Sequence, residues 1–519
     1  RRSGDAIASV PALAIRLGVG ALLHGAIVPR DIALLGPRVQ LVRQPDGHID
    51  FGLGLGARPA AGGPPLAPLP LYAVEVTDGE ITLVDQGSGL TWRIAGVALG
   101  LWPEGPGLAG RLSGALEVGT VRVPVTIDAE CRSPADGVHA PVGFHGLDPS
   151  ALATAPGVGG ALPPGATALA AGLQLPLDGT LRLALDGALV PVHARLEVAG
   201  GRGALAAPGL PGGSIAVEHV DAALEIDPAA DALRLDDLTL ELGGPTVHVR
   251  GRLAGLRGTG TIDAKATIAH LPTAALGRYW PEGVPDAARA WVEANVTGGE
   301  LRAVELRLGG TLTGGDPWRF APGALAGTLT FDGLTTRYLP AMSPLTGAAG
   351  TGVFTERALT LHVARGRVAG LGLVRAIVEI PLAADRPRIA IDLSLEGPLA
   401  KALALLDQEP LRWTREFGVP PADVGGTVAA RLVLGVPLGL SPTLAALAPR
   451  VSARMRDVAV PRLPPGWALA GGDLRLEADR ERLRLTGDVR LQGVPVTLSW
   501  SEALGARGPV GRQVDLAGR

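Results

Sequence analysis

Apolar and polar residues alternate with a period of two along most of the chain. Successive side chains of a β-strand point to opposite faces, so such a segment predicts a strand with one apolar and one polar face. Residues 180–187 (TLRLALDG) are a clear example, with leucines at alternate positions. The apolar positions of the strongest examples are Leu181, Leu183, Leu185, Val304, Leu306, Leu308, Ile389, Ile391, Leu393 and Leu395.

Turn signals separate these predicted strands. Asp-Gly pairs readily take the positive φ angles of tight hairpin turns. They occur at residues 46–47, 78–79, 136–137, 178–179, 186–187 and 332–333. One-sided strands joined by tight turns are typical of antiparallel sheets, so we expect a largely antiparallel meander.

Three segments have helical rather than strand spacing. Residues 9–24 begin with Ser9, a residue type that caps helix N-termini. Residues 285–296 begin with a proline suited to the first helical turn and are followed by Gly298, which suits a C-terminal cap. Residues 398–408 form the third predicted helix, and Pro410 ends it.

Composition supports a mostly-β protein. The chain of 519 residues is 47% hydrophobic but only 3% aromatic, and its 75 Gly and 45 Pro interrupt the apolar runs every few residues. A sheet with one apolar face must cover that face, and few helices and few large aromatic side chains are available to do so. The pattern leaves two solutions open: a second sheet packed as a sandwich, or one sheet curled into a trough that holds acyl chains.

Charge and candidate chemistry exclude several function classes. The formal net charge of −3 provides no basic field for nucleic acid. Cys131 is the only cysteine, the nine histidines are scattered singly, and no G-x-S-x-G motif occurs. We therefore expect no enzyme, no catalytic residue, no metal site and no cofactor. A polysaccharide-active enzyme would need carboxylates clustered in a cleft, and the adjacent pair Asp236 and Asp237 is expected to form a turn or bulge instead.

Two glycine-rich or apolar segments have plain structural interpretations. Residues 105–110 match G-x-G-x-x-G, but a predicted strand follows them instead of a helix, so a turn is expected. Residues 6–28 are apolar but interrupted by Pro11, Arg16 and His24, which argues against a membrane span. We expect the chain to be a fragment whose anchoring segment lies upstream.

Several blocks resemble the AsmA-like superfamily, and most closely its YhdP branch. Residues 279–281 (YWP) and 288–299 (ARAWVEANVTGG) are similar to a block of YhdP-type proteins, with Trp291 the most specific position. Residues 331–340 and 345–352 continue that resemblance. Residues 11–53 resemble the segment that follows the membrane anchor in AsmA-like proteins. The matching positions there are Leu22, Leu23, Gly25, Pro37, Val39, Leu41, Arg43, Asp46 and Gly47.

The resemblance implies a long, twisted, largely antiparallel sheet curled into a groove, with a few short helices. It implies an N-terminal AsmA-like region at 1–150, a middle groove segment at 151–270 and a YhdP-type segment at 271–519. The implied function is periplasmic transport of phospholipid between the inner and outer membranes of a Gram-negative bacterium. The acyl chains would lie on the alternating apolar positions named above. The implied partners are these acyl chains and the inner membrane, with the outer membrane as a further candidate. The alternative is an assembly factor for outer-membrane biogenesis that carries no lipid.

Overall fold

The computed structural model describes most of the chain. The described residues are 8–17, 29–44, 49–50, 73–87, 89–105, 107–131, 137–156, 158, 167, 170–187, 190–206, 213–255, 259–279, 286–313, 319–338, 341–382, 388–409, 420–437, 447–463, 466–503 and 512–518. The Asp-Gly pair at 46–47 and the matching positions Leu22, Leu23 and Gly25 lie outside them.

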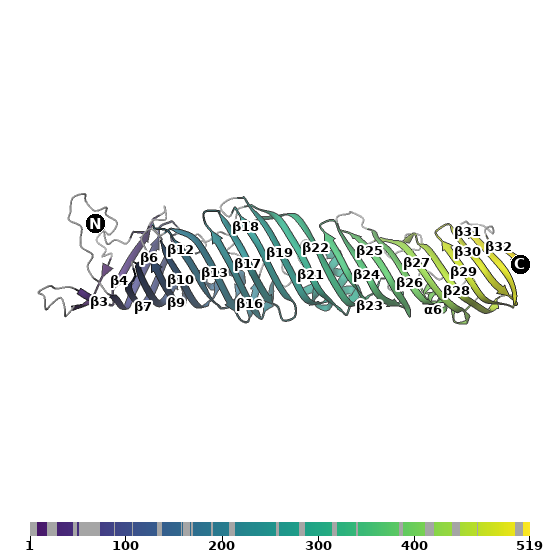
Figure 1. Cartoon of the computed structure of the whole chain (residues 1–519), viewed down its shortest axis with the longest axis horizontal. Coiled ribbons are helices and arrows are strands. Elements are labelled where there is room, and N and C mark those ends of the chain that lie inside the picture. Colours follow the sequence, from purple (N-terminus) through teal and green to yellow (C-terminus); the bar gives the residue numbers. More distant parts are fainter. Residues whose placement is uncertain are drawn as a thin grey trace. The chain divides into compact units, whose positions relative to one another are not determined.

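The chain divides into two compact units. Figure 1 labels their strands and helices and colours them along the sequence. Unit 1 comprises residues 1–266 and 308–323, and unit 2 comprises residues 267–307 and 324–519. The division passes through three long strands, which contribute residues to both units. These are β19 (Thr259–Pro272), β21 (Glu300–Thr313) and β22 (Arg319–Thr336).

Unit 1 is built on an antiparallel meander in which strands adjacent in sequence are also neighbours in the sheet. Its strands are β6 (Ala73–Asp85), β7 (Thr91–Glu104), β8 (Gly107–Val118), β9 (Val121–Cys131), β10 (Val138–Leu147), β12 (Leu177–Leu185), β13 (Pro191–Gly200), β16 (His219–Asp227), β17 (Ala232–Glu241) and β18 (Thr246–Ala254).

The N-terminal edge of unit 1 departs from this order. Strands β3 (Pro29–Leu35) and β4 (Arg38–Arg43) both run parallel to β6 and pair with successive parts of it. Strands β1 (Ala8–Ser9) and β2 (Ala12–Leu17) pair antiparallel to β4 and β3, and β5 (Ile49–Asp50) pairs with β4. The sheet is therefore mixed at this edge.

Unit 2 continues as a second antiparallel meander from β22 onwards. Its strands are β23 (Leu345–Thr355), β24 (Ala358–Val368), β25 (Leu371–Pro381), β26 (Arg388–Pro398), β27 (Gly425–Pro437), β28 (Arg450–Leu463), β29 (Trp467–Ala478), β30 (Arg482–Leu491), β31 (Val494–Ala503) and β32 (Arg512–Gly518). The short strand β20 (Val296–Thr297) pairs with the end of β22.

The helices and a small second sheet are formed by segments inserted between strands, at the ends of those strands. In unit 1, α2 (Pro149–Thr154) and β11 (Leu173–Gln174) follow β10, while β14 (Gly203–Ala206) and β15 (Ser214–Val217) follow β13. In unit 2, the 3₁₀ helix η1 (Thr273–Arg278) and α5 (Asp286–Asn295) precede β20, while α6 (Leu399–Leu406) and the 3₁₀ helix η3 (Pro421–Asp423) follow β26. Because β10 and β13 run in the same direction, the insertions of unit 1 lie at the same end of its strands.

The fold class is confirmed: the chain is mostly β, its sheet is largely antiparallel, and the helices are few and short. The helices predicted at 285–296 and 398–408 are present as α5 and α6. The turn at residues 105–110 is also confirmed, since β7 ends and β8 begins there. No helix among the described residues is long and apolar enough to cross a membrane.

The prediction of a helix at residues 9–24 is wrong for the residues of this range that the structure describes. Residues 12–17 form strand β2, and Leu13 and Ile15 lie opposite Leu34 and Ile32 of β3. A short apolar segment is compatible with either period, and here pairing with a neighbouring strand decides the outcome.

Several Asp-Gly pairs form irregularities within strands instead of the expected hairpin turns. Asp78 has a φ of 54°, and the register with β7 shifts between Val76 and Gly79. Gly333 has a φ of 71°, and the register of β22 shifts beside it. Positive φ suits a β-bulge as well as a tight turn, so the dipeptide alone does not distinguish the two. The expected bulge at Asp236 and Asp237 is confirmed by register shifts against both neighbouring strands.

Candidate functional site

One face of the unit 1 sheet carries an uninterrupted row of aliphatic side chains. Residues directly opposite each other on paired strands share a face of the sheet. From Leu34 onwards, each member of the row is half-buried. In cross-strand order the row is Leu13, Leu34, Val76, Leu99, Leu112, Ile127, Val142, Leu181, Leu196, Leu224 and Leu235. We call this the unit 1 row.

Unit 2 has an equivalent row on one face of its own meander. In cross-strand order it is Phe331, Gly350, Val363, Ala376, Leu393, Leu432, Val451, Ala478 and Leu483. Phe331, Val363 and Ala376 are buried, whereas the members from Leu393 onwards are half-buried. We call this the unit 2 row. Each unit therefore has one continuous apolar face. We call the face that carries the row of a unit the apolar face of that unit.

The alternating positions of β12 and β26 that were singled out in the sequence lie on these faces. Leu181, Leu183 and Leu185 of β12 are half-buried on one face, and Leu183 lies opposite Ala140 and Ala194. Ile389, Ile391, Leu393 and Leu395 of β26 share a face, and their partners on β27 are all apolar. Val304, Leu306 and Leu308 of β21 are half-buried and alternate with the exposed Glu305 and Arg307. That these residues bind lipid stays a prediction.

Sequence reasoning missed most members of the two rows. Residues 121–127 (VRVPVTI) show the same alternation and place Val123, Val125 and Ile127 on the apolar face of β9. That signal was available in the sequence. The contribution of Gly350 and Ala376 was not, because small residues do not stand out in a hydrophobic pattern.

The opposite face of the sheet is polar and carries ion pairs between neighbouring strands. In unit 1, Glu197 of β13 lies 2.6 Å from Arg182 and 2.9 Å from Arg195, measured between carboxylate oxygen and guanidinium nitrogen. Hydrogen bonds from Arg195 and Arg182 lower the pKa of Glu197 below its ordinary value. In unit 2, a hydrogen bond from Arg431 lowers the pKa of Asp392 in the same way. These carboxylates are ionised at neutral pH and keep this face in water.

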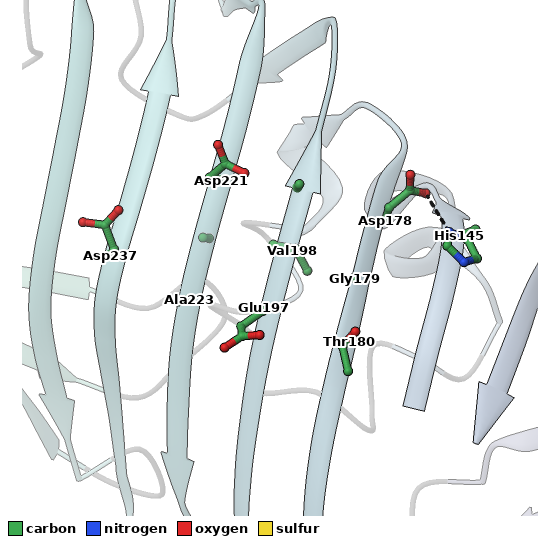
Figure 2. Close-up of a pocket in the computed structure, with 11 residues that line it drawn as sticks. His145, Asp178, Gly179, Thr180, Glu197, Val198, Asp221, Ala223 and Asp237 are labelled. Atoms are coloured by element: carbon green, nitrogen blue, oxygen red, sulfur yellow. Dashed lines mark ion pairs between the residues drawn. The ribbon is translucent and has the colours of Figure 1, made fainter. Parts of the chain in front are cut away.

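A shallow hollow of about 460 Å³ lies over β12, β13 and β16 of unit 1 (Figure 2). Its charged lining residues are His145, Asp178, Glu197, Asp221 and Asp237. Each of the four carboxylates already has a partner: Asp178 lies 3.7 Å from His145, Asp221 lies 2.7 Å from His219, and Asp237 lies 3.2 Å from Arg250. Glu197 is held by the two arginines described above. The hollow has no free acid for catalysis, and no group of three or more metal-ligating side chains occurs among the described residues.

The geometry therefore offers extended apolar surfaces and no assembled reaction centre in the part of the chain that the structure describes. The two apolar rows consist of aliphatic side chains together with Phe331 and Gly350, whereas the ion pairs described above lie on the other face. An extended surface of this kind favours contact with other apolar groups.

Comparison with known families gives one match. The model of the family described as YhdP protein matches residues 175–445, which is just over half of the 519 residues. No curated protein and no solved structure matched the chain. The resemblance noted around Trp291 is thereby confirmed, because Trp291 lies within the matched residues. The chain belongs to the YhdP family, a bacterial envelope family of the AsmA-like group.

Proposed function

We propose that this protein is a periplasmic lipid carrier that moves phospholipid between the inner and outer membranes along its apolar faces. The observation that supports it most is the unit 1 row, in which ten half-buried aliphatic residues follow Leu13 across paired strands without a polar interruption. A core closed by a second layer would bury these side chains.

The energetics of such a surface suit transport rather than capture. Each methylene group removed from water contributes about 0.8 kcal/mol, so two acyl chains gain substantial binding energy on an aliphatic face. The hydrophobic effect has no direction, and no hydrogen bond has to break when a chain moves along the row. Lipid bound this way is held out of water but is free to slide from strand to strand.

The proposal includes no chemical step. It needs no cofactor, and the residues that carry it are the row members and the alternating leucines of β12. The envelope family membership is compatible with a periplasmic location and with contact to the inner membrane through an anchor.

The test is a charge placed on the apolar face. In Leu183→Asp, a carboxylate would stand among Ala140, Ala194 and neighbouring leucines, and desolvating an unpaired charge costs several kcal/mol. We expect the phospholipid bound to unit 1 to fall at least about tenfold, since 1.4 kcal/mol already gives a factor of ten. Native mass spectrometry should then show the lipid that co-purifies with the chain reduced by the share that unit 1 carries. Leu306→Asp on β21 should act in the same direction.

The matched control is Ala184→Asp, which adds the same charge at the next residue of β12. Ala184 lies opposite His139 and His193 on the polar face, so bound lipid should stay unchanged. Circular dichroism of all three variants checks that the sheet is intact. A wild-type chain that is free of lipid would contradict the proposal and would favour an assembly role without lipid cargo.

A further inference from the structure

The apolar face of unit 1 is more covered at one end of its strands than at the other, although Ala140 and Ala194 near the less covered end are also only 8% exposed. At the end where the insertions lie, Val118 of β8 is 2% exposed and Leu177 of β12 is 6% exposed. At the opposite end, Leu108 of β8 is 49% exposed and Val192 of β13 is 46% exposed. Strand register places Val118, Leu108 and Leu177 on the apolar face, so the difference among them arises along the strands and not between the two faces. Val192 lies at the irregularity where the register of β13 with β12 shifts.

Inserted segments cause this burial. Val118 packs with Leu90, Ala155 and Val158, and Leu152 of α2 packs against the same group. The segment that contains β11 adds a second cover, because Leu175 is buried directly against Gly200 and Gly203, where a methyl group would come within 2.4 Å of it. The inserted end is therefore a protein wall over the apolar face.

Unit 2 has the same arrangement with a helix as its wall. Helix α6 lies beside the ends of β26 and β27 (Figure 1), and Leu399 belongs to a buried cluster with apolar side chains of β27 to β30. Leu405 packs on the other side, against Val368 and Leu371, and Leu371 is 1% exposed.

The C-terminal end of α6 is held by two hydrogen bonds. The backbone N–H of Ser343 donates to Oε1 of Gln408 at 2.8 Å, and Nε2 of Gln408 donates to Oγ of Ser343 at 2.9 Å.

The opposite end of unit 2 is less covered. On β27, Leu432, Leu434 and Val436 are all half-buried, so burial does not increase towards the C-terminal end of the strand. Leu483 at the start of β30 is also half-buried. Ile389 is the exception, at 8% exposed. Hairpins with charged residues, such as Asp479 and Arg482, end the strands here.

The open length of a strand is sufficient to hold a lipid tail. On β12, the half-buried alternate positions from Gly179 to Leu185 span six residue steps, or about 20 Å at ~3.4 Å per residue. The acyl chains of one leaflet occupy about 15 Å, half of the ~30 Å hydrocarbon core of a bilayer. A tail lying along the strands would therefore fit within the stretch between the hairpins and the wall of inserted segments.

From the wall at one end and the charged hairpins at the other, we propose that each unit binds its lipid in one orientation. The methyl ends of the acyl chains point towards the inserted segments, and the polar headgroup lies in water at the hairpin end. This inference rests on the proposed lipid-carrier function. It restricts the ligand to lipids that are polar at one end only, with tails of bilayer length, because a second polar end would be pressed against Val118, Leu177 or Leu371 without a partner.

The experiment uses two photoreactive phosphatidylcholines in vesicles, one with a diazirine at the acyl terminus and one with a diazirine next to the glycerol ester. Each is loaded onto the whole chain, and the crosslinked residues are mapped by mass spectrometry. We expect the terminal probe to label the inserted end, around Leu177 and Val118, several times more than the open end. The glycerol-proximal probe should show the reverse preference, around Leu108 and Val192.

The outcomes separate the two proposals. Equal labelling of both ends by both probes, or reversed labelling, would overturn the single orientation while leaving lipid binding intact. The absence of crosslinks with either probe would contradict the carrier function itself. Leu183→Asp serves as the control for specificity, because it should abolish labelling of unit 1 by both probes.

Discussion

At the residue scale, phenylalanine side chains lie over glycines of the facing strand. Phe144 pairs with Gly179, Phe354 pairs with Gly327, and the unit 2 row begins with the pair of Phe331 and Gly350. A methyl group on Gly179 would lie 2.7 Å from Cζ of Phe144, so the ring occupies the space of the missing side chain. Aromatic residues that cover glycines in this way support the sheet. Because each ring fills the space beside a glycine, it lies along the surface of the sheet.

Gly327→Ala tests this arrangement. The added methyl group would stand 2.3 Å from Cζ of Phe354 and 2.3 Å from the carbonyl oxygen of Glu305, so ring and backbone must both move. Overpacking of this kind costs about 1–3 kcal/mol, and we expect the free energy of unfolding of unit 2 to fall by that amount. Urea unfolding followed by circular dichroism measures it.

The matched control is Gly244→Ala in the turn between β17 and β18. No atom lies within 4 Å of a methyl group there, so stability should stay within a few tenths of a kcal/mol. Equal stability of the wild type and Gly327→Ala would mean that the phenyl ring yields freely and that the pair has no structural role.

At the element scale, α6 depends on its packing rather than on its own sequence. It has only eight residues, and its N-cap, Pro398, provides no side-chain hydrogen bond. Isolated helices of this length are unstable in water. The helix is held by the apolar contacts of Leu399 and Leu405 and by the hydrogen bonds of Gln408 to Ser343. It is therefore the element of unit 2 whose local stability should respond most to a single buried contact.

Leu405→Ala should loosen α6. Truncating a buried leucine costs about 2–5 kcal/mol. We expect amide hydrogen exchange in residues 399–406 to become faster by one to several orders of magnitude, at roughly tenfold per 1.4 kcal/mol of lost local stability. Lys401→Ala is the control, since Lys401 is exposed on the same helix and its exchange rates should change little. Unchanged exchange in Leu405→Ala would show that contacts other than Leu405 hold the helix.

At the scale of the whole molecule, each unit has its own apolar face. If both faces bind acyl chains, one chain of this protein should carry more than one phospholipid. Native mass spectrometry should then show a series of peaks separated by the mass of one lipid. The two faces can be tested separately, because the unit 1 row and the unit 2 row consist of different residues.

Leu196→Asp in the unit 1 row and Leu432→Asp in the unit 2 row should each remove part of the bound lipid. The double variant should remove the sum of the two losses, since distant sites act independently. Ser394→Asp serves as the control in unit 2, because Ser394 lies opposite Arg431 on the polar face. A single variant that removed all bound lipid would show instead that the two faces load as one cooperative site.

The sequence by itself determined the one-sided strands, through their period-two pattern, and the helices α5 and α6, through helical spacing and terminal proline and glycine residues. Side-chain direction alternates along any strand, so alternation in sequence becomes a division into two faces regardless of what surrounds the strand. The prediction from the sequence was wrong where a local signal is compatible with two structures, such as a helix and a strand, or a tight turn and a β-bulge. Residues 12–17 pair as a strand because Leu13 meets Leu34, and Asp78 and Gly79 form a bulge because the partner strand continues past them.

Only the tertiary structure decided which residues meet across the sheet and which end of each apolar face is covered. The unit 1 row depends on the register of many strand pairs, and a shift of one residue in any of them would break it. The wall at the inserted end arises because α2, Leu175 and α6 pack back onto the strand ends. Leu177 and Leu185 have the same parity and nearly the same sequence surroundings, yet one is buried and the other half-buried. The difference comes from the position of Leu177 at the end of the strand where the inserted segments lie, and that position leaves no mark on the local hydrophobic pattern.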